Sequence, residues 1–552
     1  MEKLYRQEKN IQQLEASLDA YQSAFRLADY VEKTYDSDEA RLFLNKIKYT
    51  AHSKPIDISI LLYKLTSKRN FLEEAYFFDQ RNKASILSLN IQENEIRKNF
   101  SSANKLYTEE ASLKSAITRL SLKASQVKDS SQIQQFNASI RDYEIQLGKI
   151  QEKISDDPSY REKEFAERIP TIEQLQHMLG NTSAILSYHL SDSAILLLFI
   201  SENKFEYYQI PINNEFFDRL DSFKSALHEI SNEKKYTGQE MSTSLYQVLI
   251  RPVQPRLSGF DRLIIIPDDE LNYLPFEALQ DQDKKYLVEK FSIQYQFSTA
   301  LIASKEANKR STNILAFAPF TENNFNDTNN FTLDKLPGSK EEIKNLSGKI
   351  FTDSLATKNN FIKQANHFGI IHLATHAIVN NELPLRSFIA FYPGDKSNPD
   401  DYRLYAQEIY TMNLDSARLI ILSACETGAG QLVRGEGLMS LSRAFAYAGC
   451  PNIITSLWKA EDKATSFITQ RLHIYLDKGF TKDKALQQAK LDLLKSTDID
   501  PRFKTPNYWA HLIYIGNHEV YHDSSNWWWI AISIILITTV YIYLKRKRPA
   551  HY

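Results

Sequence analysis

Apolar residues in roughly the first 166 positions recur at spacings of three and four, as at Leu14, Leu18, Tyr21, Phe25 and Ala28. This period places apolar side chains on one face of a helix. Polar, turn-forming residues interrupt the pattern at 35–38 and at 67–70. Helices separated by such short turns are typical of stacked helical hairpins, so the pattern predicts degenerate, tetratricopeptide-like helical repeats over residues 1–105.

The composition changes over residues 106–168, where Glu, Lys, Gln and Ser dominate and Leu or Ile are spaced apart. This composition predicts a long helical hairpin with its turn at 129–131. The charged side chains of the hairpin are expected to form a solvated helix face.

After Pro170 the apolar residues gather in short runs that are typical of strands. The runs cover residues 184–190, 194–200, 205–210, 263–267, 313–317, 370–374, 419–423 and 452–457. Most are continuous rather than alternating, and helical stretches lie between them. Strands of this kind are buried on both faces, so the sequence predicts a mostly parallel sheet with helices on each side.

The last part of the chain differs again, because residues 527–544 carry no charge and basic residues follow at 545–548. The uncharged stretch is long enough to cross a bilayer. It predicts one C-terminal transmembrane helix over 527–544, a basic tail over 545–552 and a single-pass membrane protein. The basic flank favours a cytoplasmic C-terminus. Residues 1–8 show no apolar signal-peptide core, so the side of the membrane that holds the bulk domain stays open.

Length and composition argue against several classes of protein. A chain of 552 residues exceeds one hydrophobic core. Its 67 basic and 68 acidic residues give a net charge of −1, which does not favour nucleic acid as a partner. The two cysteines, Cys425 and Cys450, are too few for a disulfide framework, a four-thiolate zinc site or an iron–sulfur cluster. We therefore expect no metal and no organic cofactor.

Two of the predicted strands run out to residues that can do chemistry, His376 and Cys425. Loops after the carboxyl ends of strands in α/β sheets present side chains to ligands. A thiol needs a nearby base to act as a nucleophile near neutral pH, and an imidazole can supply it. Either residue alone is more often structural, and we expect Cys450 and His372 to be interior residues of that kind.

Several ordered motifs resemble the CHAT family of caspase-like cysteine peptidase domains, which are commonly fused to tetratricopeptide repeats. The motifs lie at 265–279, 336–342, 372–377, 422–428, 435–438 and 455–462. The resemblance implies a caspase-like αβα sandwich over residues 169–520, with His376 and Cys425 matching the catalytic pair. Their separation, 425 minus 376 or 49 residues, is close to the value of about 50 in caspases.

One residue departs from the family pattern, since Ala377 replaces the glycine that usually follows the catalytic histidine. The resemblance assigns the oxyanion hole to the backbone N–H groups of Ala377 and Cys425, and alanine keeps that N–H. Glu426, Glu436 and Asp462 lie in or near the motif loops. They are candidates for a substrate pocket that accepts a basic side chain, or else they are solvated or capping carboxylates.

Taken together, the sequence predicts a membrane-anchored cysteine endopeptidase that cleaves protein or peptide substrates through a His376–Cys425 dyad. The helical repeats would bind a regulatory protein partner. The alternative is a catalytically inactive caspase-like scaffold that acts as an interaction module at the membrane.

Overall fold

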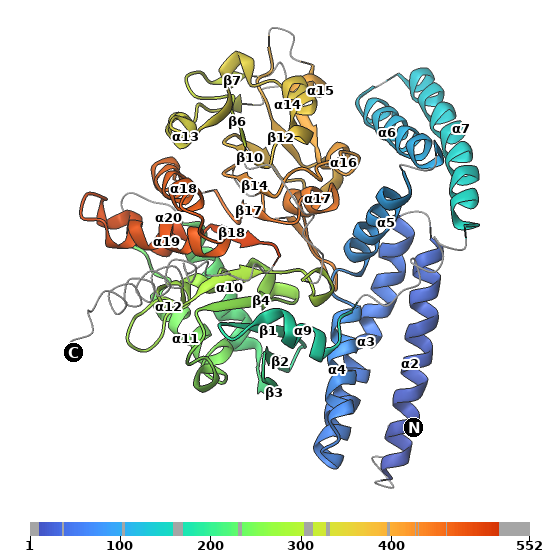
Figure 1. The fold of residues 1–552 in the computed structure, drawn as a ribbon, viewed down its shortest axis with the longest axis vertical. Coiled ribbons are helices and arrows are strands. Elements are labelled where there is room, and N and C mark those ends of the chain that lie inside the picture. Colours follow the sequence, from blue (N-terminus) through green and yellow to red (C-terminus); the bar gives the residue numbers. More distant parts are fainter. Residues whose placement is uncertain are drawn as a thin grey trace, which may run out of the picture. The chain divides into compact units, whose positions relative to one another are not determined.

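The computed structural model describes residues 10–35, 38–101, 105–127, 129–157, 169–229, 235–302, 313–326, 332–394, 398–424, 427–428, 430–459 and 461–517. These residues belong to one unit, Met1–His518. Figure 1 shows a helical N-terminal region followed by a large sheet with helices on its faces.

The N-terminal region is helical, as the apolar spacing predicts. Its helices are α2 (Ile11–Thr34), α3 (Asp38–Thr66), α4 (Arg69–Arg81), α5 (Ser85–Ser101), α6 (Lys105–Gln126) and α7 (Ser130–Ser155). The breaks after α2 and α3 fall at the two predicted turns. Asp129 caps α7 by accepting a hydrogen bond from the Ser131 N–H, which explains why the chain turns there. The predicted extent of repeats and hairpin stays a prediction.

The sheet has eleven strands in the order β3-β2-β1-β4-β5-β18-β17-β14-β10-β6-β9. Their bounds are β1 Ser183–Leu190, β2 Ala194–Ser201, β3 Lys204–Pro211, β4 Arg262–Ile266, β5 Ser292–Tyr295, β6 Ile314–Ala318, β9 Gly348–Thr352, β10 Ile370–Leu373, β14 Leu419–Leu422, β17 Ile453–Ser456 and β18 Leu512–Ile515. Every run predicted as a strand forms one of them.

Most neighbouring strands in the sheet are parallel, as predicted, but two parallel halves run in opposite directions. Strands β1, β4, β5 and β18 are parallel to one another, and so are β17, β14, β10, β6 and β9. The halves meet at the antiparallel β17–β18 pair. Beyond β1, the sheet continues with β2 and β3, which are antiparallel to their neighbours. The carboxyl ends of the two halves therefore lie at opposite edges of the sheet.

Helices cover both faces of each half. They are α9 (Ile172–Leu179), α10 (Asn214–His228), α11 (Gln239–Leu249), α12 (Leu287–Lys290), α13 (Pro337–Ile343), α14 (Lys358–Gln364), α15 (Pro399–Tyr402), α16 (Ala406–Ile409), α17 (Leu441–Tyr447), α18 (Asp462–Asp477), α19 (Lys482–Lys495) and α20 (Pro506–Trp509). Alternate residues of β1 face different cores: Leu186 packs with α10 and α11, whereas Ile185 packs with α9 and the N-terminal helices. The N-terminal helices are therefore part of the covering of the sheet.

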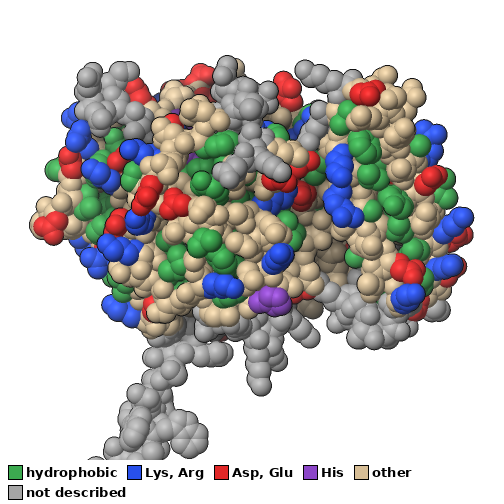
Figure 2. All heavy atoms as spheres, turned by 90° about the horizontal axis from the view of Figure 1, so that it is seen from above, with side chains coloured by type: hydrophobic (Ala, Val, Ile, Leu, Met, Phe, Trp, Pro, Cys, Tyr) green, Lys and Arg blue, Asp and Glu red, His purple; other side chains and the backbone are tan. Residues whose placement is uncertain are grey.

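Short strands outside the main sheet form three small sheets. These strands are β7 (Phe325–Asn326), β8 (Thr332–Leu333), β11 (Ala377–Ile378), β12 (Phe388–Ala390), β13 (Arg403–Tyr405), β15 (Gly430–Val433) and β16 (Gly437–Ser440). The β15–β16 hairpin joins the Cys425 segment to α17. On the face seen in Figure 2, basic and acidic side chains are interspersed.

The predicted transmembrane helix and single-pass membrane localisation need correction. No helix among the described residues is long and apolar enough to cross a membrane. The uncharged stretch 527–544 lies outside the described residues. Lack of charge over 18 residues is a property of composition alone and does not by itself establish a spanning helix. Membrane anchoring therefore forms no part of the function proposed below.

Candidate functional site

The register of two neighbouring strands places the predicted dyad positions at one edge of the sheet. Strands β10 and β14 are parallel, and Leu373 pairs with Leu422. His376 follows Leu373 by three residues, and Cys425 follows Leu422 by three residues. Neighbouring strands lie about 4.8 Å apart, so the two segments leave the sheet side by side. Cys425 itself lies outside the described residues.

His376 is half-buried and tethered by one ring nitrogen. Its Nε2 lies 2.6 Å from the backbone oxygen of Asp334, and its ring centroid lies 5.2 Å from that of Phe320. Because a carbonyl only accepts hydrogen bonds, Nε2 carries a proton and donates it. In the neutral ring Nδ1 is then the nitrogen that can accept a proton.

The electrostatic surroundings keep His376 neutral near pH 7. Burial lowers the pKa of His376, and the nearby charge of Lys459 lowers it further. The hydrogen bond to Asp334 and the charges of Asp334 and Asp462 oppose this change. A neutral imidazole is the form that can act as a base. Sequence reasoning missed Asp334 and Phe320, although Asp334 lies just before the motif at 336–342.

Residues just after position 425 are held by hydrogen bonds to β17. The buried Thr427 hydroxyl accepts hydrogen bonds from the Thr455 hydroxyl at 2.9 Å and from the Ser456 N–H at 3.2 Å. The Gly428 N–H donates to the Ser456 oxygen at 2.8 Å. A Cβ at Gly428 would lie 2.9 Å from a methyl group of Thr455, so glycine suits this close approach. The short segment that contains Cys425 thus starts and ends at fixed points.

The backbone of Ala377 has the geometry of an ordinary strand. Ala377 pairs with Ile389, and the Ala390 N–H donates to the His376 oxygen at 2.9 Å. Hydrogen-bonded and non-hydrogen-bonded pairs alternate in an antiparallel ladder, so the Ala377 N–H points away from β12. Ala377 is not among the residues with a positive φ. Alanine is therefore accommodated at this position without strain.

The two predicted pocket carboxylates that the structure describes, Glu436 and Asp462, do not lie in one place. Asp462, the first residue of α18, is half-buried, accepts a hydrogen bond from the Gly338 N–H and acts electrostatically on His376. Burial raises the pKa of Asp462. Glu436 is 1% exposed and is bound by other groups, and Glu426 lies outside the described residues. Of these two described carboxylates, Asp462 is the one brought towards His376.

Glu436 instead joins the N-terminal helices to the hairpin after Cys425. Its carboxylate accepts hydrogen bonds from Asn45 at 3.1 Å, from the Ser85 hydroxyl at 3.0 Å and from the Ile86 N–H at 3.0 Å. Arg443 of α17 forms an ion pair with the same carboxylate.

The neighbouring Gly435 brings the same two regions into backbone contact. Its oxygen accepts a hydrogen bond from the Ala84 N–H at 2.7 Å. It has φ +81°, and a Cβ there would lie 2.8 Å from the Asn82 oxygen, so the contact requires glycine. The partners of Gly435 and Glu436 in the helical region lie more than 340 residues earlier, which is why the sequence did not reveal them.

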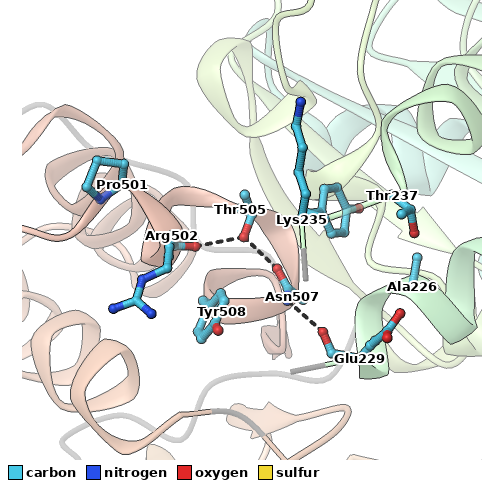
Figure 3. Close-up of a pocket in the computed structure, with 10 residues that line it drawn as sticks. Ala226, Glu229, Lys235, Thr237, Pro501, Arg502, Thr505, Asn507 and Tyr508 are labelled. Carbon is cyan, nitrogen blue, oxygen red and sulfur yellow. Dashed lines mark hydrogen bonds between the residues drawn. The ribbon is translucent and has the colours of Figure 1, made fainter. Parts of the chain in front are cut away.

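A pocket of about 240 Å³ lies elsewhere on the molecule (Figure 3). Its lining residues are Ala226, Glu229, Lys235, Tyr236, Thr237, Pro501, Arg502, Thr505, Asn507 and Tyr508. Asn507 binds both sides of it, accepting from the Thr505 hydroxyl and donating to the Glu229 oxygen. The pocket contains none of the predicted site residues, and its volume is below the range of about 300–1,000 Å³ typical of ligand sites.

Comparison with known proteins gives relatives of two kinds. Mouse tetratricopeptide repeat protein 28 is 23% identical over 335 residues, and the human protein of that name is 22% identical over 330 residues. Each match covers 50% of this chain and 13% of the relative's length.

Three solved structures are also similar. The Saccharomyces cerevisiae separase–securin complex matches with a TM-score of 0.37 and 11% identity, covering 76% of this chain and 37% of that chain. The Arg-specific cysteine proteinase gingipain R matches with a TM-score of 0.33 and 12% identity, covering 55% of this chain and 74% of that chain. The gingipain of Porphyromonas gingivalis also matches as a complex of its pro- and mature domains.

The family described as CHAT domain matches residues 239–517. This range includes His376, Cys425 and the strands that lead to them, whereas strands β1 to β3 precede it. The match extends over just over half of the sequence, and the chain therefore belongs to the CHAT domain family.

Proposed function

We propose that this chain is a caspase-like cysteine endopeptidase that acts on protein or peptide substrates. One observation carries the proposal: a neutral His376, tethered through Nε2, follows β10 at the register at which Cys425 follows β14. Nucleophilic catalysis by cysteine needs a base within reach of the thiol, and the adjacent strands β10 and β14 lead to both residues.

The proposed reaction proceeds in two steps. His376 Nδ1 takes the proton of the Cys425 thiol, and the thiolate attacks the peptide carbonyl. The backbone N–H groups of Ala377 and Cys425 stabilise the oxyanion. His376 returns its proton to the leaving amine, which leaves a thioester on Cys425. Water, deprotonated by His376, then attacks the thioester, releases the carboxylate product and restores the thiol.

Asp462 contributes a negative charge beside this site. It acts on His376 electrostatically and is half-buried, so it remains our candidate for contact with a basic substrate side chain. Glu426 stays a sequence-based candidate for the same pocket. The carboxylate of Glu436 is already bound on all sides by Asn45, Ser85, Ile86 and Arg443, so we assign it to the helical region.

The helical region is proposed to bind a regulatory protein. Glu436 and Gly435 connect that region to the β15–β16 hairpin, which starts two residues after Gly428. A partner that shifts α3 or α5 would therefore act on the segment that carries Cys425. The Glu436→Gln variant should slow alkylation of Cys425 several-fold, whereas Glu289→Gln, at an exposed pair with Lys285, should leave the rate unchanged.

The catalytic proposal is tested by proteolysis with the full chain. Purified protein is incubated with a cell extract, and new peptide termini are identified by mass spectrometry. We expect termini that appear with the unmodified chain and disappear with Cys425→Ala and His376→Ala. A thiol-directed probe should label Cys425 in a His376-dependent way, while the buried Cys450 stays unlabelled.

The alternative, a non-catalytic scaffold, makes the opposite prediction. If the chain is a scaffold, the unmodified chain and Cys425→Ala should give the same peptide termini. The probe should label Cys425 at the same rate in the unmodified chain and in His376→Ala. Either cleavage that survives Cys425→Ala, or the scaffold result, would overturn the proposed peptidase.

A further inference from the structure

Three titratable side chains are buried together behind the end of β14. Glu342 of α13, His372 of β10 and His473 of α18 are 3%, 0% and 4% exposed. His372 Nδ1 lies 3.0 Å from His473 Nε2, and His372 Nε2 lies 3.1 Å from Glu342 Oε2. The sequence correctly predicts that His372 is interior. Polar groups in such a core are costly unless they are hydrogen-bonded, and here they bond to one another.

The hydrogen-bonded row of Glu342, His372 and His473 also contacts the segment that leads to Cys425. His372 Nε2 also lies 3.1 Å from the hydroxyl of Ser423, the first residue after β14. The Ser423 hydroxyl lies 3.4 Å from the backbone oxygen of Leu373. Ser423 is two residues before Cys425, and His372 is four residues before His376. One buried histidine therefore contacts the segments that carry both members of the proposed dyad.

One group in this row, the Glu342 carboxyl, gains or loses a proton near neutral pH. Burial raises the pKa of Glu342 to about 7, although hydrogen bonds from Ser423 and Thr469 oppose the change. Burial lowers the pKa of His372 to about 3 and that of His473 well below its usual value, so both rings are neutral. The carboxyl group is therefore the one that gains or loses a proton.

The elements packed around Glu342 contribute few other charges. Helix α18 contributes His473 and Asp462, and the charge of Glu342 raises the pKa of Asp462. Strand β10 contributes His372, β14 is followed by Ser423, and β6 contributes the apolar Ala316 and Ala318 beside α13.

The protonation state of Glu342 sets the direction of the hydrogen bonds. An ionised Glu342 can only accept, so His372 Nε2 carries the proton and Nδ1 accepts from His473. A protonated Glu342 can donate to His372 Nε2, and His372 then donates through Nδ1 to His473. Ser423 faces the same Nε2 and also hydrogen-bonds Glu342. Its hydroxyl therefore has a carboxylate to donate to in the first state and a weaker, neutral acceptor in the second.

We propose that Glu342 and His372 are positioning residues, which hold Ser423 and the segment leading to Cys425 in an arrangement that depends on the proton held by Glu342. This inference rests on the proposed peptidase function, because its effect is read at Cys425. It concerns regulation of that site by pH and adds no group that touches substrate.

The test measures alkylation of Cys425 by iodoacetamide in the full chain between pH 5 and pH 9. Mass mapping distinguishes Cys425 from Cys450, which is buried and serves as the internal reference. We expect the rate ratio between Glu342→Gln and the unmodified chain to be constant below pH 6 and to change by at least about threefold across pH 6–8, since glutamine cannot ionise.

Two further variants locate the effect. Ser423→Ala should lower the rate, and adding Glu342→Gln to it should give a ratio that no longer changes with pH. The matched control is Glu277→Gln, another buried carboxyl group, held by Tyr295 and Lys490 away from this row. Its rate ratio should stay constant with pH. Ser423→Ala leaves the buried Glu342–His372 pair intact. It therefore tests the link between that pair and Cys425 even if Glu342→Gln does not fold.

A ratio for Glu342→Gln that stays flat with pH, or one that changes equally when Ser423 is alanine, would overturn the inference. His376→Ala separates this failure from failure of the proposed function. If His376→Ala leaves the alkylation rate unchanged, the peptidase proposal fails. If it slows alkylation while the Glu342→Gln ratio is flat, only the positioning role fails.

Discussion

The two halves of the sheet end in similar side chains at opposite edges but treat them differently. At one edge β1 ends beside His189, and Asp268 follows β4, and both are covered by the N-terminal helices and buried. At the other edge His376 follows β10 and is half-buried, with a backbone oxygen as its partner. The polar residues at the first edge bind other groups of the protein, whereas His376 at the second edge stays partly accessible.

The covered edge uses its charges to hold helices in place. Lys83, just after α4, donates to Asp79 at 2.7 Å, to the Ser187 hydroxyl at 3.0 Å and to the Tyr188 oxygen at 2.6 Å. Burial alone would raise the pKa of Asp268, but the hydrogen bond of His189 and the charge of Lys83 lower it. Asp268 therefore stays ionised in the core, bound to groups of the protein itself.

The largest expected effect separates the two strand-end histidines. His376→Ala should lower the rate of Cys425-dependent cleavage by about 10²–10⁴-fold, the usual contribution of a general acid–base group. His189→Gln, at the covered edge, should leave the rate per folded molecule unchanged. Both rates are measured on a cleaved peptide identified from the cell extract. Equal losses in the two variants would break the distinction between the edges.

The next effect concerns stability at the covered edge. Lys83→Met leaves Asp79 buried without its cation and should lower the free energy of unfolding by about 3–5 kcal/mol. The control Lys285→Met removes an exposed partner of Glu289 and should cost less than about 1 kcal/mol. Urea denaturation followed by circular dichroism measures both. A loss below 1 kcal/mol for Lys83→Met would mean that these charges do not hold the helices.

The covered edge should also weaken in acid because of His52 on α3. Burial, together with the charge of His189, lowers the pKa of His52 to about 4. The unfolded chain takes up this proton below its ordinary pKa of about 6.5, so stability is full above that pH and is lost as pH falls towards 4.

This histidine alone should reduce the free energy of unfolding by about 2 kcal/mol between pH 7 and pH 5. In His52→Gln the decline should be smaller by that amount, as measured by urea denaturation at both pH values. An identical decline in the two proteins would contradict the assignment.

The smallest effect is expected at the edge of the sheet that carries His376. The charge of Asp462 raises the pKa of His376, so Asp462→Asn should lower it and move the acidic limb of the cleavage profile to lower pH by less than about one unit. Asparagine can still accept the hydrogen bond from the Gly338 N–H. A shift to higher pH would show that Asp462 acts on the reaction by another route.

Sequence patterning predicted most of the fold because long apolar runs become buried strands wherever they fall. It missed β5, β9 and β18, each of four or five residues. The run at 292–295 alternates polar and apolar residues, and only its position between β4 and β18 buries it on both faces. Burial of that kind is a tertiary property that a local pattern does not contain.

The candidate site was predicted in part for the same reason. His376 follows an apolar strand, and its position at a carboxyl end can be read locally. The contacts of Glu342 with His372 and of Glu436 with Asn45 join positions 30 and 391 residues apart, so no local spacing marks them. The motifs at 336–342 and 435–438 marked these residues as noteworthy but gave no partner for them.

The position of β18 has a consequence for biosynthesis. This strand is the last one described, yet it lies in the middle of the sheet, between β5 and β17. While the ribosome is still making residues 512–515, both neighbours have unpaired edges, and exposed edges of this kind promote association between chains. We expect nascent chains to need chaperone protection until β18 inserts, and the two half-sheets to become one cooperative unit only in that final step.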